Sequence, residues 1–181
     1  MMRSRICLLC AVLFSVASAV GAQPVATEAI EKHFDKIRSS LKLERFQQDR
    51  EIVAGESLRF EYLYYHDSNG KLVKMRVLEF ENEPNASVKV DDYFFANGDL
   101  RLVRLYFFMN SSRLETLRKG EIVPLLTGEH IEMKDGKLVR WNALGKEIPS
   151  TDRRWRDKTT SVTTSLGVEM MFYKEFKKPK G

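Results

Sequence analysis

The sequence is poor in cysteine. Its two cysteines, Cys7 and Cys10, both lie within the first ten residues. Loss of the N-terminal segment would leave a chain without any cysteine, which excludes disulfides, thiol nucleophiles and thiolate metal sites. Small secreted proteins often depend on disulfides, but a chain of this length buries ~68–70% of its unfolded surface without them. We therefore expect one domain held together by its hydrophobic core.

Catalytic motifs are also missing. The patterns G-x-S-x-G, H-E-x-x-H, G-x-G-x-x-G, C-x-x-C and the P-loop do not occur in residues 23–181. The segment "YHDSNG" contains His66, Asp67 and Ser68 in succession, but three successive turn residues point in diverging directions and do not form a hydrolytic triad. Aspartate, serine and asparagine are the ordinary residues of turns. We predict no catalytic residue and no cofactor.

Potential metal ligands are few. The segment "EHIEMKDG" puts His130 and Glu132 on one face of a strand, with Glu129 beside them. A zinc site generally needs three or four protein ligands, and this strand offers two. The remaining histidine, His33, lies on the first predicted helix and is expected to be solvated or half-buried beside the apolar stripe. We predict no metal site.

No apolar run is long enough to span a bilayer, which requires ~20 residues. The run at 6–22, "ICLLCAVLFSVASAVGA", follows Arg3 and Arg5 and ends in small residues, as in a secretory signal peptide. Cleavage after Ala22 is favoured, and after Ala19 is the alternative. The sequence thus predicts a signal peptide at 1–22 and one domain at 23–181, secreted or periplasmic and not integral to the membrane.

The charge excess is small. The full chain carries a net charge of +5, with 43% hydrophobic and 30% charged residues, which is typical of a globular protein. Because the signal peptide contains two arginines and no acid, the remainder is only mildly basic. Such a balance does not indicate nucleic-acid binding. Asn85 and Asn110 begin glycosylation sequons, which matter only in a host that glycosylates on export.

Helical periodicity marks both ends of the chain. Ile30, Phe34, Ile37 and Leu41 form one stripe of an N-terminal helix at 27–41, with Thr27 as its expected cap. Near the C-terminus the apolar stripe of a second helix consists of Val162, Leu166, Met170, Tyr173 and Phe176. The segment "NSSRLETLRKGE" predicts a short helix that ends at Gly120. The tail "KKPKG" is expected to be frayed.

Between these helices the period changes to two. From Ser57 onward Leu58, Phe60, Tyr62 and Tyr64 share one face, and we expect the sheet to begin there. Asn-Gly and Asp-Gly pairs ending at Gly70, Gly98 and Gly136 predict three hairpin turns.

The strand after Gly98 is apolar on both faces, so a central position is expected, with Phe107 buried. We predict an α+β fold: an N-terminal helix packed on a single antiparallel β-meander sheet of about six to seven strands, with a C-terminal helix. The cover of the second sheet face is left open between that helix and a partner.

The combination of "AIEKHFDKIRSSL" with the aromatic hairpins "YYHDSNGKL" and "YFFANGDL" resembles small exported bacterial proteins of uncharacterised function. It differs from the MORN repeat, because no glycine recurs at a regular spacing. The resemblance implies an envelope protein and supplies no active-site residues.

The segment "DRRWRDK" offers the one candidate binding stretch. Arg153, Arg154 and Arg156 surround Trp155, a combination suited to phosphate, carboxylate or base recognition. The alternative is a linker in which the tryptophan anchors to the sheet and the arginines face water or pair with neighbouring acids.

Three hypotheses about function remain. The first is an exported binding or interaction protein without a catalytic site, whose aromatic-rich sheet face holds an unknown protein or an apolar ligand. The second is an envelope-surface binder of anionic lipid or polysaccharide through Arg153, Arg154, Trp155 and Arg156. The third is a hydrolase whose site the sequence does not identify.

Overall fold

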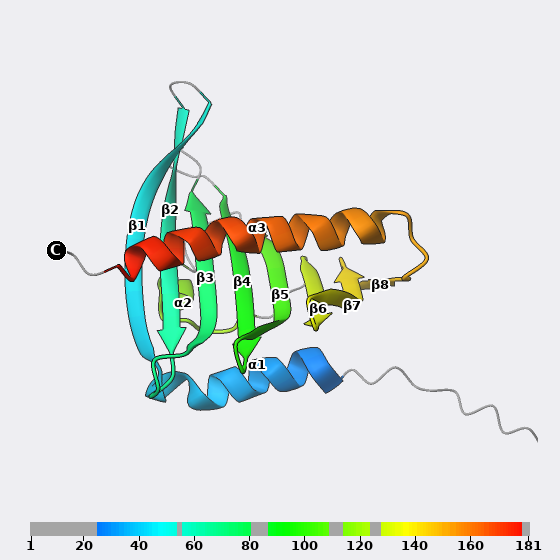
Figure 1. Ribbon diagram of the computed structural model, residues 1–181, viewed down its shortest axis with the longest axis horizontal. Helices are drawn as coiled ribbons and strands as arrows, with labels where there is room; N and C mark the ends of the chain where they lie inside the picture. The colour runs from blue at the N-terminus through cyan, green and yellow to red at the C-terminus, as the bar shows by residue number, and fades with distance from the viewer. Residues whose placement is uncertain (1–24, 54–55, 81–86, 109–113, 124–127, 179–181) are drawn as a thin grey trace, which may run out of the picture.

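The computed structural model describes residues 25–53, 56–80, 87–108, 114–123 and 128–178 (Figure 1). The predicted signal peptide, both sequons and the end of the tail lie outside these residues. The helices are α1 (Val25–Ile37), a 3₁₀ helix (Arg38–Ser40), α2 (Leu114–Arg118) and α3 (Arg154–Phe176). The strands are β1 (Lys42–Val53), β2 (Glu56–His66), β3 (Leu72–Phe80), β4 (Val88–Ala96), β5 (Asp99–Phe108), β6 (Glu129–Lys134), β7 (Lys137–Ala143) and β8 (Lys146–Ile148).

The strands form one antiparallel sheet in which every strand lies beside its neighbours in sequence, in the order β1 to β8. The predicted α+β fold with an N-terminal helix, a single meander sheet and a C-terminal helix is confirmed. The sheet has eight strands instead of six to seven. None of the helices in the described part of the chain is long and apolar enough to cross a membrane.

The additional strands lie at the two edges of the sheet. The prediction that the sheet begins at Ser57 is wrong, because β1 starts at Lys42 and pairs with β2 along its length. Polar side chains dominate β1 and hide its period-two pattern. At the other edge, β7 and β8 are joined by a turn in which Leu144 and Gly145 both have positive φ, 52° and 76°. A leucine in this conformation is uncommon, and no Asn-Gly or Asp-Gly pair marks this turn in the sequence.

The predicted hairpin turns are confirmed. Asn97 (φ 56°) and Gly98 (φ 89°) connect β4 to β5, while Asp135 and Gly136 connect β6 to β7 in the same conformation. Positive φ at both central residues is what a two-residue hairpin turn requires. The β2–β3 loop is longer, and within it the backbone N–H of Gly70 donates to the carbonyl of Asp67.

Both faces of the sheet are covered by the chain's own helices. Along β2, Tyr62 and Tyr64 belong to a core cluster that packs against α3, whereas Leu63 and Tyr65 belong to a second cluster with α1 and α2. Since successive side chains of a strand point to opposite faces, the two clusters lie on the two sides of the sheet. Figure 1 shows α3 crossing one face from β7 to β1. The sequence left open whether the C-terminal helix or a partner covers the second sheet face, and the structure shows that α3 covers it.

Strand β5 lies in the middle of the sheet, as predicted, but its C-terminal end has a neighbouring strand on one side only. Leu102 and Val103 are fully buried, one on each face. The prediction that Phe107 is buried is wrong, because this side chain is 61% exposed. Strand β6 pairs with β5 only between Leu102 and Leu105, so Phe107 extends past the part of β5 that is shielded by strands on both sides.

The predicted helix at 27–41 ends earlier than expected, because α1 stops at Ile37 and a 3₁₀ helix separates it from Leu41. Phe34 of α1 is buried, and Leu117 of α2 is buried in the same cluster. Helix α3 begins at Arg154, before its predicted stripe, which packs on the sheet as expected. Thr27 does not cap α1: it lies inside the helix, and its hydroxyl donates to the carboxylate of Glu132 on β6. That contact ties the start of α1 to the sheet.

Candidate functional site

A network of charged groups is buried between the sheet and the loop that follows α2. Arg76 donates to both carboxylate oxygens of Asp92, at 2.6 and 2.7 Å, and the ammonium of Lys74 lies 3.2 Å from Asp92 Oδ2. The hydroxyl of Tyr106 donates to the same oxygen at 3.0 Å. Although burial acts to raise it, the pKa of Asp92 is held well below its usual range by Arg76 and Lys74.

Arg104 connects this network to helix α1. Its guanidinium is buried, its Nε lies 2.9 Å from Glu31 Oε1, and it donates to the backbone carbonyl of Val123. The contact is an ion pair without a hydrogen bond, because neither Arg104 Nε nor Glu31 Oε1 has a hydrogen-bond partner. Burial nevertheless raises the pKa of Glu31, because desolvation outweighs the attraction of Arg104.

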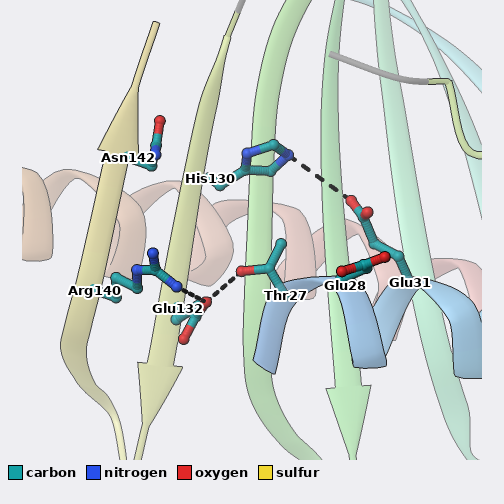
Figure 2. A pocket seen from close by; sticks show the side chains of 7 residues that line it. All are labelled: Thr27, Glu28, Glu31, His130, Glu132, Arg140 and Asn142. Atoms are coloured by element: carbon teal, nitrogen blue, oxygen red, sulfur yellow. Dashed lines mark hydrogen bonds and ion pairs between the residues drawn. The ribbon is translucent and has the colours of Figure 1, made fainter. Parts of the chain in front are cut away.

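In front of Glu31 is the imidazole of His130 on β6. Its Nε2 lies 3.8 Å from Glu31 Oε1 (Figure 2). Burial, with the nearby charge of Arg104, lowers the pKa of His130 to about 4. The imidazole is therefore neutral at pH 7 and presents one hydrogen-bond donor and one acceptor.

These side chains line a polar pocket of about 240 Å³ between α1, β6 and β7. Figure 2 shows Thr27 and Glu31 of α1 facing His130 and Glu132 of β6 across it, with Arg140 beside Glu132. Arg140 lies 3.7 Å from Glu132 and 3.0 Å from Glu147. We call this site the polar pocket; its lining residues are Thr27, Glu28, Glu31, His130, Glu132, Arg140 and Asn142.

The polar pocket is rich in hydrogen-bond acceptors. Three carboxylates line it, and its only cationic lining residue, Arg140, lies between two carboxylates, Glu132 and Glu147. Carboxylates accept hydrogen bonds and do not donate them when ionised. A ligand that fits this lining brings donors, as an ammonium or a hydroxyl does. Within the described residues, no group of three or more histidine, cysteine or acidic side chains is arranged to hold a metal ion.

A second pocket lies along another side of α1 and is mainly apolar. It has a volume of about 210 Å³. Behind it, the ammonium of Lys74 lies within 4.6 Å of the ring centroids of Phe34 and Phe94. Its lining residues are Ala29, Ile30, His33, Phe34, Val73, Phe94, Phe95, Ala96 and Arg101, and we call it the apolar pocket.

The predicted binding stretch lies elsewhere, at the start of α3. Arg154 makes a two-point contact with the carboxylate of Asp152, at 3.0 and 2.9 Å, while Arg153 and Arg156 are exposed. Trp155 is half-buried and contacts Trp141, with ring centroids 6.4 Å apart. None of these residues lines the polar pocket.

The histidines of the chain occupy three different environments. His33 is exposed, in agreement with the prediction. His66 is the last residue of β2, not part of the turn, and its Nε2 lies 2.9 Å from the hydroxyl of Tyr173 on α3. Asp67 Oδ1 accepts hydrogen bonds from the backbone N–H groups of Asn69 and Lys71, which is the role of a turn residue.

Sequence reasoning placed His130 and Glu132 on one face of a strand but predicted no site there. The structure puts both residues in the lining of the polar pocket. The contributions of Glu31 and Arg140 were not predicted, because the sequence does not show which strand faces which turn of α1. The available signal was the polar face of α1, on which Thr27 and Glu31 are four residues apart.

No protein-family model matches this chain, and neither a curated protein nor a solved structure matches it. Inferences about function therefore depend on the geometry of the two pockets and on the exposed surfaces of the fold.

Proposed function

We propose that this chain is an exported binding protein whose site is the polar pocket, and that its ligand is a small polar molecule carrying a primary ammonium group. The observation that carries the proposal is the convergence of the Glu31 and Glu132 carboxylates, from two separate elements, on one pocket beside a neutral His130. An ammonium supplies three donors and a positive charge, which match these acceptors.

The surroundings of the Glu31 carboxyl group also favour an ammonium ligand. Buried Arg104 attracts the carboxylate of Glu31, but Glu31 Oε1 is buried without a hydrogen-bond partner, so a ligand that donates to this oxygen would satisfy it. The raised pKa of Glu31, which results from burial, shows that ionisation of this carboxyl is costly in the absence of a further cation. A bound ammonium would supply that cation.

The test uses three four-carbon compounds of similar length: 1,4-diaminobutane, butane-1,4-diol and succinate. Calorimetric titration at pH 7 is expected to show binding of the diamine, weaker binding of the diol and none of succinate. Glu132→Gln should weaken diamine binding by about tenfold or more, since a hydrogen bond to a charged group contributes ~1.5–3 kcal/mol. Turnover of an added ester or amide at this pocket would instead favour the hydrolase hypothesis.

The matched control is Glu115→Gln. This exposed glutamate of α2 also pairs with an arginine, Arg118, but lies outside the polar pocket. It should leave diamine binding unchanged. Equal binding of all three compounds, or diamine binding that Glu132→Gln and His130→Gln both leave intact, would refute the proposal.

A second candidate function keeps the hypothesis of an apolar ligand on the aromatic sheet. Tyr62, Tyr64 and Tyr93 are buried, whereas Phe94 and Phe95 line the apolar pocket. Arg101 supplies a guanidinium at the same pocket, which favours an apolar compound ending in a carboxylate. Octanoate, compared with octanol and octylamine, tests this candidate; loss of octanoate binding in Arg101→Gln is expected, and preference for octylamine would contradict it.

A further inference from the structure

Strand β1 leaves one long edge of the sheet unpaired. It is the outermost strand and, among the residues that the structure describes, it pairs only with β2. Its twelve residues contrast with the three of β8 at the opposite edge. The free N–H and C=O groups of an edge strand can form a ladder with another strand. Edge β1 is thus long enough to accept one.

An aromatic patch lies beside this edge, on the face covered by α3. Phe46 of β1 contacts Phe176 of α3, with ring centroids 5.5 Å apart, and both side chains are only partly buried. Phe172 belongs to the same patch, and a pocket of about 200 Å³ opens between these rings, Gln48, Glu175 and Lys178. Grouped aromatic side chains at a partly exposed site are typical of protein interfaces. We call these three phenylalanines the edge patch.

The other face of β1 carries exposed charges, Arg45 and Asp49, on either side of Gln47. If a second copy pairs antiparallel about a two-fold axis at Gln47, each Arg45 lies opposite the Asp49 of the other copy, and both contacts are attractive. A two-fold axis at Arg45 or at Asp49 would place two like charges opposite each other. The charge pattern therefore favours one register for self-pairing.

The existing contacts of these two residues are exposed and weak. Asp49 lies 3.5 Å from Arg59, and both of these side chains are about two-thirds exposed, 66% and 67%. Arg45 donates to the backbone carbonyl of Arg118 at 3.1 Å, also at the surface. Exposed contacts of this kind contribute little stability, so an opposing strand can replace them.

We propose that the protein forms a symmetric dimer by antiparallel pairing of β1 with β1 of a second copy, centred on Gln47. Three features favour a second copy of the chain as the partner of β1: the unpaired backbone edge, the complementary charges of Arg45 and Asp49, and the edge patch. Because the axis passes through Gln47, the edge patches of the two copies lie on the same face of the joined sheet. Each patch thereby gains an apolar neighbour.

Disulfide trapping tests the register. In a Cys7→Ser, Cys10→Ser background, Gln47→Cys places two thiols opposite each other at a Cα separation of about 4.5–5.5 Å, within disulfide reach. Oxidation should give a covalent dimer at micromolar concentration. The control Asp49→Cys lies on the same face, but its two copies would be about 13 Å apart along the strand, and it should give no covalent dimer. Equal cross-linking of both variants would overturn the register.

Charge exchange tests the interface without a covalent bond. Sedimentation analysis of the purified protein should show a dimer, and Arg45→Asp should weaken dimerisation at least tenfold by placing like charges opposite each other. Arg45→Asp combined with Asp49→Arg should restore it. Circular dichroism verifies that each variant is folded, as expected for substitutions at exposed positions. A wild-type monomer at all concentrations, or a double variant as weak as the single one, would overturn the proposal.

Discussion

Asp92→Asn should be among the most destabilising polar substitutions in this protein. The Asp92 carboxylate is fully buried and faces Arg76, Lys74 and the hydroxyl of Tyr106. Its neutralisation leaves buried cations with too few anions, because Glu31 is then the remaining carboxylate of the network. Breaking a buried ion pair from one side costs about 3–5 kcal/mol, and we expect the free energy of unfolding to fall by that amount.

Lys74→Met, in the same network, should behave differently. The Lys74 ammonium is fully buried between the rings of Phe34 and Phe94, where the thioether of methionine also fits. The substitution removes the surplus cation and loses its cation–π contacts and its ion pair with Asp92, whose carboxylate keeps Arg76 as a partner. We expect the free energy of unfolding to change by less than about 1.5 kcal/mol. Asp92→Asn with Lys74→Met should therefore cost less than the sum of the two single changes.

Urea denaturation at pH 7, followed by circular dichroism, measures all three variants, with Asp99→Asn at an exposed turn as the control. The pH dependence provides a second readout. Burial lowers the pKa of Lys74 well below its usual 10.5, so between these values the unfolded chain binds the additional proton and stability rises with pH. Lys74→Met should remove this rise. A loss in Lys74→Met as large as that in Asp92→Asn would refute the reasoning.

Three further outcomes are expected. Leu102→Ala should cost ~2–5 kcal/mol in thermal or urea unfolding, whereas exposed Phe107→Ala should cost far less; similar losses would contradict the exposure of Phe107. His130→Gln should flatten the dependence of stability on pH between pH 4 and 6.5. In this window only the unfolded wild-type chain binds the proton of His130, so wild-type stability rises with pH. An unchanged slope would contradict the burial of His130. Trp155→Ala should lower the Tm because it removes the contact with Trp141, whereas replacing the arginines at 153, 154 and 156 by glutamine should not lower it. Salt-sensitive binding to anionic vesicles that is lost only in the glutamine variant would instead support the envelope-surface hypothesis.

Periodicity predicted the elements that one stripe or one face defines. Phe34 of α1, Tyr62 and Tyr64 of β2 and Tyr173 of α3 all pack where their spacing placed them. The turns were equally readable, because positive φ restricts the choice of residue at Asn97–Gly98. These features depend on neighbours in the sequence, so local chemistry was sufficient to find them.

The edges of the sheet and the charged interior were harder to predict. Strand β1 has one side without a neighbour in the described structure, and charged residues such as Arg45 and Asp49 are favoured there, which removes the alternation that reveals a strand. Arg76 and Arg104 broke the apolar pattern of β3 and β5, and only their partners, Asp92 and Glu31, explain their burial. Such pairings join residues distant in sequence, and no spacing rule gives them.

The neighbour-to-neighbour order of the strands has a consequence for folding speed. Each hairpin can close as soon as its second strand is available, so loop closure is inexpensive and the sheet can grow from β1 toward β8. Helix α3 comes last in the chain, yet its ring contacts extend from Trp141 on β7 to Phe46 on β1. Until α3 docks, Tyr62 and Tyr64 of β2 stay in contact with water. The interval between sheet formation and helix docking is therefore when this chain is most prone to aggregate.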